Sequence, residues 1–333
     1  MSQLFSGQDT LSIFEIGCRS NMEDCIYPAY GEATDKDRLF ILCDGMGGHE
    51  NGEVASGIVC RVMADYIQNH SKGFITDETI KAALNDAIEN LDKEDNGASR
   101  KMGTTMTLLY FHRGGCIAAH IGDSRIYHIR PKNSRIMYKS RDHSLVYDLY
   151  MAGEIDKEEM ATYSRKNVIT RAIMPNQDEC PKTDIVHITD IKAGDIFYMC
   201  SDGMLEQMGD EELVDVLCCD MSWDEKREQL IELTKDNKDN HSAYIISITE
   251  VVKEEGDEAL CDDEATSKSN AVYLETQRDG ASDVCVVSTT SDKTWILETV
   301  EKEETIHNAM RRTLWVVFIV VMIAVFLIVA LTK

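Results

Sequence analysis

Short apolar runs alternate with longer amphipathic segments over residues 11–252 of this chain. Runs rich in β-branched and apolar residues, bounded by glycine, aspartate or asparagine, are typical of strands. Several of these runs are separated only by short turns, and this spacing favours antiparallel pairing. The predicted strands are Leu11–Ile16, Leu39–Cys43, Thr104–Tyr110, Cys116–Ile121, Arg125–Ile129, Asp195–Cys200 and Ala243–Thr249.

Amphipathic helices are predicted in two groups around these strands. The first helix is predicted from Glu50 to about Asn69, and its four-residue spacing is carried by Val54, Ile58, Val62 and Tyr66. The next has apolar residues at similar spacing between Ile80 and Leu91, and Thr76 or Asp77 would cap its start. Later helices are predicted at Glu211–Cys218 and Trp223–Asp236. This grouping predicts an α+β fold in which helices pack on sheets.

The character of the chain changes after Val252. Lys253–Glu264 is strongly acidic and has few apolar residues, a composition typical of a solvated linker. The apolar runs Val284–Val287 and Thr294–Val300 fit a terminal hairpin, isolated strands or part of the linker, and the sequence does not choose among these. We predict a folded domain, an acidic linker and a terminal segment over residues 1–252, 253–310 and 311–333, respectively.

Leu314–Leu331 is a run of 18 residues without charge or proline. A helix of this length spans roughly 27 Å, close to the hydrocarbon thickness of a bilayer. A buried core helix is the alternative, but core helices seldom lack a polar face over such a length. Arg311 and Arg312 precede the run, and the positive-inside rule then keeps the preceding chain in the cytoplasm. We therefore expect a single-pass C-terminal membrane anchor.

Charge and cysteine usage narrow the class of protein. The formal net charge is -25, with 59 acidic against 34 basic residues, which argues against binding of nucleic acid. Eleven cysteines are scattered without a C-x-x-C pair, so we expect reduced thiols in a cytosolic compartment. This pattern favours neither a disulfide framework nor a zinc site.

Acidic residues stand beside glycine, asparagine or a turn at four separate places. Asp44 and Asp202 each follow an apolar strand, Asp239 precedes one, and Glu23-Asp24 follows another. Magnesium and manganese prefer oxygen ligands, and clustered carboxylates repel one another unless cations neutralise them. Glycine after Asp44 lets the backbone turn so that the carbonyl of Gly45 can reach a metal. The pattern predicts a carboxylate site for hard divalent ions.

These residues and the motifs between them resemble the metal-dependent type-2C (PPM) serine/threonine protein phosphatases. The similarity covers about Leu11 to Glu250, and some stretches are most similar to bacterial members. Single motifs are weak signals, but here the whole set follows the family's order. The motifs are Arg19…Met22–Asp24, Asp44–His49, Gly103–Thr105, Ile121–Arg125, Asp142–Ser144, Ile169–Ala172, Ser201–Gly203 and Asp239–Asn240.

The resemblance implies a four-layer α-β-β-α sandwich of two antiparallel sheets flanked by helices, with two Mn²⁺ or Mg²⁺ ions in a cleft between the sheets. Asp44 would bridge the ions, and the Gly45 carbonyl would complete the coordination of one. Asp202 and Asp239 would hold the other. In some members a third ion is bound, and here Asp123 with Asp202 would hold it.

The resemblance also implies the activity and its remaining residues. Glu23 and Asp24 would order metal-bound waters, and Arg19 would bind the phosphate of the substrate. The expected reaction is hydrolysis of phosphoserine and phosphothreonine in proteins by a metal-activated water. The membrane anchor suggests a membrane Ser/Thr kinase and its targets as partners. A silent phosphoprotein-binding scaffold, a small anti-sigma-type regulator as substrate and a lipid-linked phosphate are the alternatives.

Three positions depart from the family pattern or leave their role open. Met46 stands where many eukaryotic members carry histidine, and methionine cannot donate a proton. His49 is either a substitute general acid or a packing residue, so the acid stays unassigned. Glu206 stands where some relatives use aspartate as a ligand. Residues 153–166 would form a flap beside the cleft, or only an exposed loop or short helix.

Overall fold

The computed structural model describes residues 3–5, 8–47, 51–95, 102–253, 270–278 and 281–289. The chain divides into two compact units, Met1–Ala259 and Leu260–Lys333, and each is described by itself.

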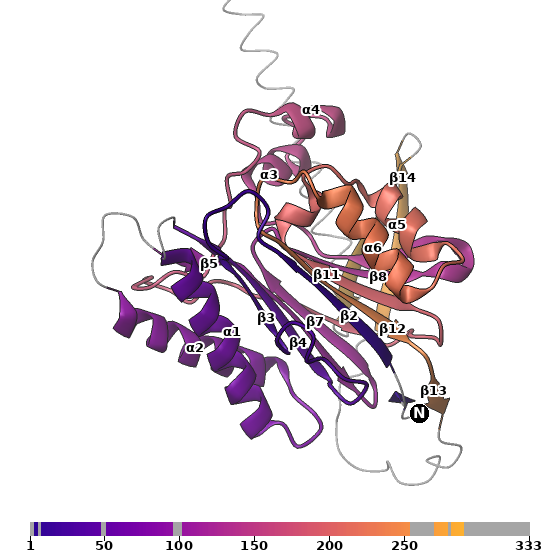
Figure 1. The fold of residues 1–333 in the computed structure, drawn as a ribbon, viewed down its shortest axis with the longest axis horizontal. Coiled ribbons are helices and arrows are strands. Elements are labelled where there is room, and N and C mark those ends of the chain that lie inside the picture. Colours follow the sequence, from indigo (N-terminus) through magenta and orange to yellow (C-terminus); the bar gives the residue numbers. More distant parts are fainter. Residues whose placement is uncertain are drawn as a thin grey trace, which may run out of the picture. The chain divides into compact units, whose positions relative to one another are not determined.

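The first sheet of the larger unit has the strand order β10-β7-β6-β4-β3, and the short β5 pairs with the end of β4. All of these pairings are antiparallel. Its outer face is covered by helices α1 (Asn51–His70) and α2 (Asp77–Glu94) (Figure 1). The strands are β3 (Asp24–Tyr27), β4 (Leu39–Met46), β5 (Gly103–Thr104), β6 (Met106–His112), β7 (Gly115–Ile121) and β10 (Asp184–Ile188).

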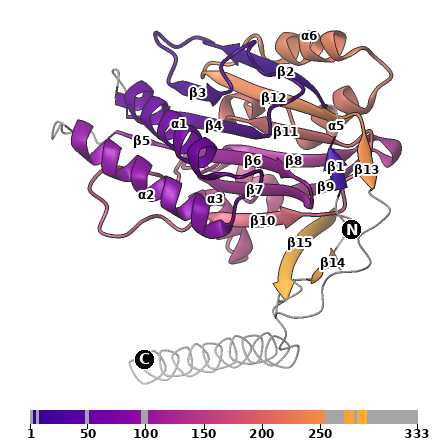
Figure 2. The ribbon, with the colours of Figure 1, turned by 90° about the horizontal axis from the view of Figure 1, so that it is seen from below.

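The second sheet has the order β2-β12-β11-β8-β9 and is also antiparallel. Helices α5 (Asp210–Cys218) and α6 (Trp223–Thr234) cover its outer face, opposite α1 and α2 (Figure 2). The predicted four-layer α-β-β-α sandwich is therefore confirmed. The strands are β2 (Gln8–Glu15), β8 (Arg125–Arg130), β9 (Arg135–Lys139), β11 (Ile196–Cys200) and β12 (His241–Ile248), and a separate pair joins β1 (Gln3–Phe5) to β13 (Val251–Lys253).

Side chains along β4 alternate between two cores. Leu39, Ile41 and Cys43 pack against the helices of the first layer. The ring of Phe40 points to the other side, where it lies edge-on to Tyr244 of the second sheet at 5.2 Å between centroids. Because successive side chains point to opposite faces, the next acidic residue of the strand lies on the side between the sheets.

Helix α1 forms where it was predicted, but its buried face is shifted. Ala55, Val59 and Met63 are buried against the sheet, whereas Val54 is 39% exposed. Gly52, Ala55 and Ser56 are small buried residues of this face, and they let the helix lie close to β4. The predicted stripe of larger residues therefore lies partly at the edge of the buried face. At the start of α2, Thr76 accepts a hydrogen bond from the backbone of Thr79, which makes Thr76 the cap.

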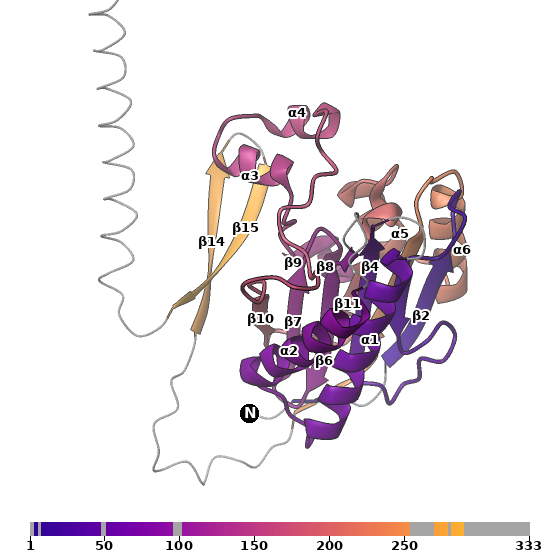
Figure 3. The ribbon, with the colours of Figure 1, turned by 90° about the vertical axis from the view of Figure 1, so that its left-hand side faces the viewer.

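Several short elements were not predicted from the sequence. They include β3, β9 and β10, which have four or five residues each, too few for a clear period. Two short helices, α3 (Leu145–Met151) and α4 (Lys157–Thr162), lie beyond one end of the sheets (Figures 1 and 3). Helix α4 falls within the predicted flap segment.

The second unit contains a hairpin of β14 (Asn270–Arg278) and β15 (Ala281–Thr289). Val284–Val287 lies in β15, and its partner strand precedes it in the chain. Thr294–Val300 and Leu314–Leu331 lie outside the described residues. Within the described ranges, none of the helices has the length and apolar character that a membrane span needs.

Candidate metal centre

The pairing of β3 with β4 places two acidic residues directly opposite each other. Asp24 and Asp44 are cross-strand partners. In the neighbouring pair, the Gly45 amide donates to the Glu23 carbonyl at 3.1 Å. Hydrogen-bonded and non-hydrogen-bonded pairs alternate, so the two aspartates form a non-hydrogen-bonded pair, the type in which side chains lie closest.

The other predicted acidic ligands reach the same place from separate strand ends. Asp123 follows β7, Asp202 follows β11 at the start of a short 3₁₀ helix (Asp202–Leu205), and Asp239 precedes β12. Burial raises the pKa of Asp44 well above its usual range, and the negative charges of Asp24, Asp202, Asp123 and Asp239 raise it further. The structure therefore brings all five aspartates into one electrostatic cluster.

Burial and neighbouring charges also raise the pKa values of two other aspartates of the cluster. Burial is the main cause that raises the pKa of Asp24 to about 7, and the charges of Asp202 and Asp239 add to it. Burial, followed by the charge of Asp239, raises the pKa of Asp202 to about 6. Cations at the cluster would relieve this repulsion.

Two buried carboxylate oxygens of the cluster lack a partner among the described residues. They are Oδ1 of Asp24 and Oδ1 of Asp123. The other oxygen of Asp24 accepts a hydrogen bond from Ser201 Oγ at 2.9 Å. A buried oxygen without a donor is costly, and a hard cation or its bound water would satisfy it. The residues present therefore fit Mg²⁺ or Mn²⁺.

Arg19 lies at the rim of the cluster. Its Nη2 is 2.5 Å from Asp239 Oδ2, and its Nη1 is 4.0 Å from Glu23 Oε2. The side chain of Arg19 is 48% exposed, so it faces both the carboxylates and solvent. This position suits a group that would contact an anion bound beside the metals.

The backbone at Asp44 is fixed by two threonines whose role the sequence did not reveal. The Asp44 amide donates to Thr105 Oγ1 at 3.1 Å, and Thr104 Oγ1 donates to the Asp44 carbonyl at 2.9 Å. Thr105 Oγ1 also lies 2.7 Å from Ser124 Oγ, next to Asp123. The Gly103–Thr105 motif was recognised, but only the fold shows what it holds.

Asn240 is a second positioning residue that sequence reasoning left without a role. Its side-chain oxygen accepts from the Glu23 amide at 2.8 Å. Its amide group donates to the carbonyls of Ile16 and Asn21. Asn240 therefore ties the segment that carries Arg19 and Glu23 to the start of β12.

Gly45 is required for close packing. A Cβ atom there would lie 2.2 Å from the carbonyl oxygen of Gly52 in α1 and 2.5 Å from that of Glu23. From the sequence we expect Gly45 to allow a turn of the backbone, whereas in the structure Gly45 lies within β4. The reason for glycine is therefore contact with α1, and metal binding by its carbonyl stays a prediction.

The three departures from the family pattern have different outcomes. Met46 ends β4 beside the cluster, and His49 lies outside the described residues. Glu206 Oε2 accepts a hydrogen bond from the Lys238 amide at 2.7 Å. It therefore supports the loop that leads to Asp239.

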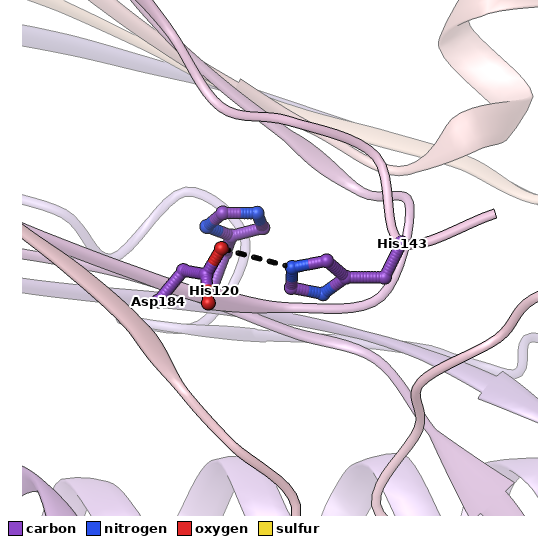
Figure 4. Close-up of side chains that lie close together, drawn as sticks. All are labelled: His120, His143 and Asp184. Atoms are coloured by element: carbon purple, nitrogen blue, oxygen red, sulfur yellow. Dashed lines mark hydrogen bonds and ion pairs between the residues drawn. The ribbon is translucent and has the colours of Figure 1, made fainter. Parts of the chain in front are cut away.

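A second group of ligand-type side chains consists of His120, His143 and Asp184 (Figure 4). The two imidazole rings are nearly parallel, at 11° and 4.6 Å between centroids. Imidazole lone pairs lie in the ring plane, so parallel rings do not direct them to one ion. Arg171 Nη1 also lies 2.8 Å from both His143 Nε2 and Asp184 Oδ1. This geometry favours a structural role over metal binding. We call the hydrogen-bonded group of His143, Arg171 and Asp184 the clamp.

The clamp joins the two ends of the segment that contains α3 and α4. His143 precedes the segment and Arg171 follows it. The Thr170 amide donates to the His143 carbonyl at 2.8 Å, and the His143 amide donates to the Gly122 carbonyl at 2.9 Å. Because Gly122 precedes Asp123, the base of this segment is connected to the carboxylate cluster.

A two-sheet sandwich with a partly buried carboxylate cluster, contributed by strand ends of both sheets, fits a metal-dependent hydrolase of the phosphatase type. The family model for protein phosphatase 2C matches residues 23–238. The chain belongs to the protein phosphatase 2C family. The predicted family and the predicted class, protein-serine/threonine phosphatase, are thereby confirmed.

Bacterial relatives agree with this assignment. The chain is 31% identical over 206 residues to the serine/threonine phosphatase stp of Listeria welshimeri, a match that covers 60% of this chain and 79% of the relative. It is 32% identical over 201 residues to a putative protein phosphatase 2C-type of Streptococcus pyogenes, covering 59% and 78%.

Solved structures share the fold. The Mycobacterium tuberculosis phosphatase PstP/Ppp superposes with a TM-score of 0.62 at 27% identity, covering 73% of this chain and 100% of that one. A structure of the PstP catalytic domain in complex with two manganese ions gives a TM-score of 0.60 at 27% identity, covering 73% and 99%.

Proposed function

We propose that this chain hydrolyses phosphoserine and phosphothreonine in proteins with two bound Mn²⁺ or Mg²⁺ ions. The observation that carries the proposal is the partly buried cluster of five aspartates, in which two buried oxygens have no hydrogen-bond partner among the residues that the structure describes. The two manganese ions in the related PstP structure support the stoichiometry. When bound, such ions activate a water for attack on phosphorus and offset charge on the phosphoryl oxygens.

Different residues of the chain would bind different ions. Asp44, which is fixed by Thr104 and Thr105, would bridge them, and the Gly45 carbonyl would reach one. Asp202 and Asp239 would hold the other. Asp123 would take part in a third site, and its buried oxygen, which has no partner in the described part of the chain, supports this role.

The residues at the rim would handle water and substrate. Glu23 and Asp24 would orient metal-bound waters, and Arg19 would turn from Asp239 to the substrate phosphate. Met46 cannot supply a proton to the leaving alkoxide, so we assign no side chain to that step. A silent scaffold would not need these carboxylates, and their presence argues for the enzyme.

Metal-dependent phosphate release tests the proposal. The purified full chain should release phosphate from a phosphothreonine peptide and from p-nitrophenyl phosphate when Mn²⁺ is present. Chelation with EDTA should abolish the release, and fresh Mn²⁺ should restore it. Release that is insensitive to EDTA, or no release with any divalent ion, would contradict the proposal.

We further propose that Leu314–Leu331 anchors the enzyme in a membrane with the catalytic domain in the cytoplasm. Its length, the absence of charge and the preceding Arg311-Arg312 support this. The full chain should sediment with membranes and resist extraction with carbonate, whereas a chain ending at residue 310 should stay in the supernatant. If the full chain and the shortened chain partitioned equally, the proposed membrane anchor would be wrong.

A membrane anchor would raise the local concentration of the enzyme near membrane-bound substrates. We therefore propose phosphorylated proteins at the membrane, including a Ser/Thr kinase and its targets, as substrates. Comparison of phosphothreonine sites in cells with and without the active enzyme tests this pairing. Unchanged phosphorylation of membrane kinases would rule it out.

A further inference from the structure

Three cysteines meet behind the carboxylate cluster. Cys25 and Cys43 are cross-strand partners on β3 and β4, on the face that α1 covers. Cys60 lies on α1, in the same core cluster. Because side chains alternate along a strand, these sulfurs lie on the face opposite Asp24 and Asp44.

The helix register places Cys60 over Cys25. Ser56 Oγ donates to the Glu23 carbonyl at 2.5 Å. Four residues along a helix advance about 6 Å, and two residues along a strand advance about 6.8 Å. The step from Ser56 to Cys60 therefore matches the step from Glu23 to Cys25. The three thiols are near enough for Cys60 to act on the ionisation of Cys25 and for Cys43 to act on that of Cys60.

We propose that Cys25 and Cys60 form a reversible disulfide when the protein is exposed to a peroxide, and that this bond lowers phosphatase activity. Cys25 is the entry point because it is only partly buried, whereas Cys60 is 1% exposed and Cys43 is 0% exposed. The effect on activity rests on the proposed function, while formation of the bond does not.

The chemistry balances with hydrogen peroxide as the oxidant. The Cys25 sulfur attacks one peroxide oxygen, the O–O bond breaks, and water leaves with the thiol proton, which gives a sulfenic acid. The Cys60 sulfur then displaces the hydroxyl from the Cys25 sulfur, and a second water leaves. Two thiols are oxidised by two electrons, and one peroxide is reduced to two waters.

The bond should disturb the carboxylates. The sulfurs must move from non-bonded separation to about 2.05 Å. Helix α1 is already in contact with both strands, through Gly52 on Gly45 of β4 and through Ser56 on Glu23 just before β3. Because a rigid approach is blocked, the bond must turn the Cys25 side chain and shift the backbone around it, where Asp24 directly precedes Cys25. Because Cys25 is only partly exposed, its oxidation is expected to be slow.

Peptide mapping of the full chain tests the inference without any variant. The folded protein is incubated with hydrogen peroxide, its remaining thiols are alkylated, and it is digested under non-reducing conditions. We expect a cross-linked Cys25–Cys60 peptide that appears in step with loss of most phosphate release, and dithiothreitol should reverse both. Cys60→Ser should keep its activity through the same treatment, whereas Cys180→Ser, which removes an exposed thiol, should behave as wild type.

Two results would overturn the inference. One is the absence of the cross-link while the exposed Cys18 and Cys180 become oxidised. The other is a cross-linked protein with undiminished activity. Because the map does not depend on activity, a protein that is inactive from the start would contradict the proposed function and leave the map as a separate test of the disulfide.

Discussion

Arg19 and Asp239 show how one residue pair can serve two states of a site. In this structure the guanidinium lies 2.5 Å from the carboxylate, where it offsets part of the cluster's negative charge. The same carboxylate is predicted to bind a metal, and the same guanidinium is predicted to bind phosphate. Metal binding and release of Arg19 toward the substrate should therefore be coupled.

Arg19→Ala tests this coupling. We expect kcat/KM to fall about 10²-fold, because a charge-assisted contact to the phosphate is lost. Mn²⁺ should bind at least as tightly as to wild type in calorimetry, since a competitor for Asp239 is gone. Arg19→Lys keeps the positive charge but lacks the planar guanidinium, so its kcat/KM should lie between those of the wild type and Arg19→Ala. An unchanged kcat/KM would remove Arg19 from substrate binding.

Replacing a glycine by alanine should have opposite effects on stability in strand β4 and in helix α1. Gly45→Ala should destabilise the protein by at least about 2 kcal/mol, because the added methyl meets backbone atoms that cannot move aside. Gly57→Ala on α1 has no atom within 4 Å of the added Cβ and should stabilise by about 0.5–1 kcal/mol. Denaturant unfolding measures both, and equal effects would contradict the close packing of α1 on β4.

The clamp of His143, Arg171 and Asp184 predicts a pH dependence of stability. Burial lowers the pKa of His143 to about 4, below the unfolded value of about 6.5. The unfolded chain then binds more protons than the folded one between these values, so stability falls as pH drops from about 6.5 toward 4.

Thermal unfolding across this window tests the clamp. The loss is expected to be at most about 2 kcal/mol after solvent screening. The pKa of Asp184 is also lowered, by hydrogen bonds and charges from His143 and Arg171 against the opposing effect of burial, so its contribution is lost at still lower pH. His143→Gln cannot gain a proton and should flatten the decline above pH 4. The same slope in wild type and variant would assign the loss to other groups.

These helices and strands show which parts of the structure can be predicted from sequence patterns. Apolar periodicity located the long helices and the central strands, because each repeats its period several times. It missed β3 and β10, which are too short to show one, and it shifted the buried face of α1. The aspartates were found by their motifs, whereas Asn240 and Thr105 act through the backbone of other residues. Only the folded arrangement reveals such contacts.

For the molecule as a whole, bound metal should act as a structural element. The five aspartates repel one another, so removing cations leaves partly buried charge that opposes folding. At Mn²⁺ concentrations 100 times Kd, binding is expected to add about 2.7 kcal/mol per site. Scanning calorimetry with Mn²⁺ and with EDTA checks this, and a melting temperature that is unaffected by either would contradict the assigned cluster.

The most direct test of a bridging Asp44 is the rate of phosphate release from a phosphothreonine peptide during a Mn²⁺ titration. Asp44→Asn should lower kcat/KM at least about 10³-fold at every Mn²⁺ concentration. Asp224→Asn, which changes a surface residue that is 75% exposed, should match wild type. Activity of Asp44→Asn within a few-fold of wild type, with the same dependence on Mn²⁺, would contradict the account.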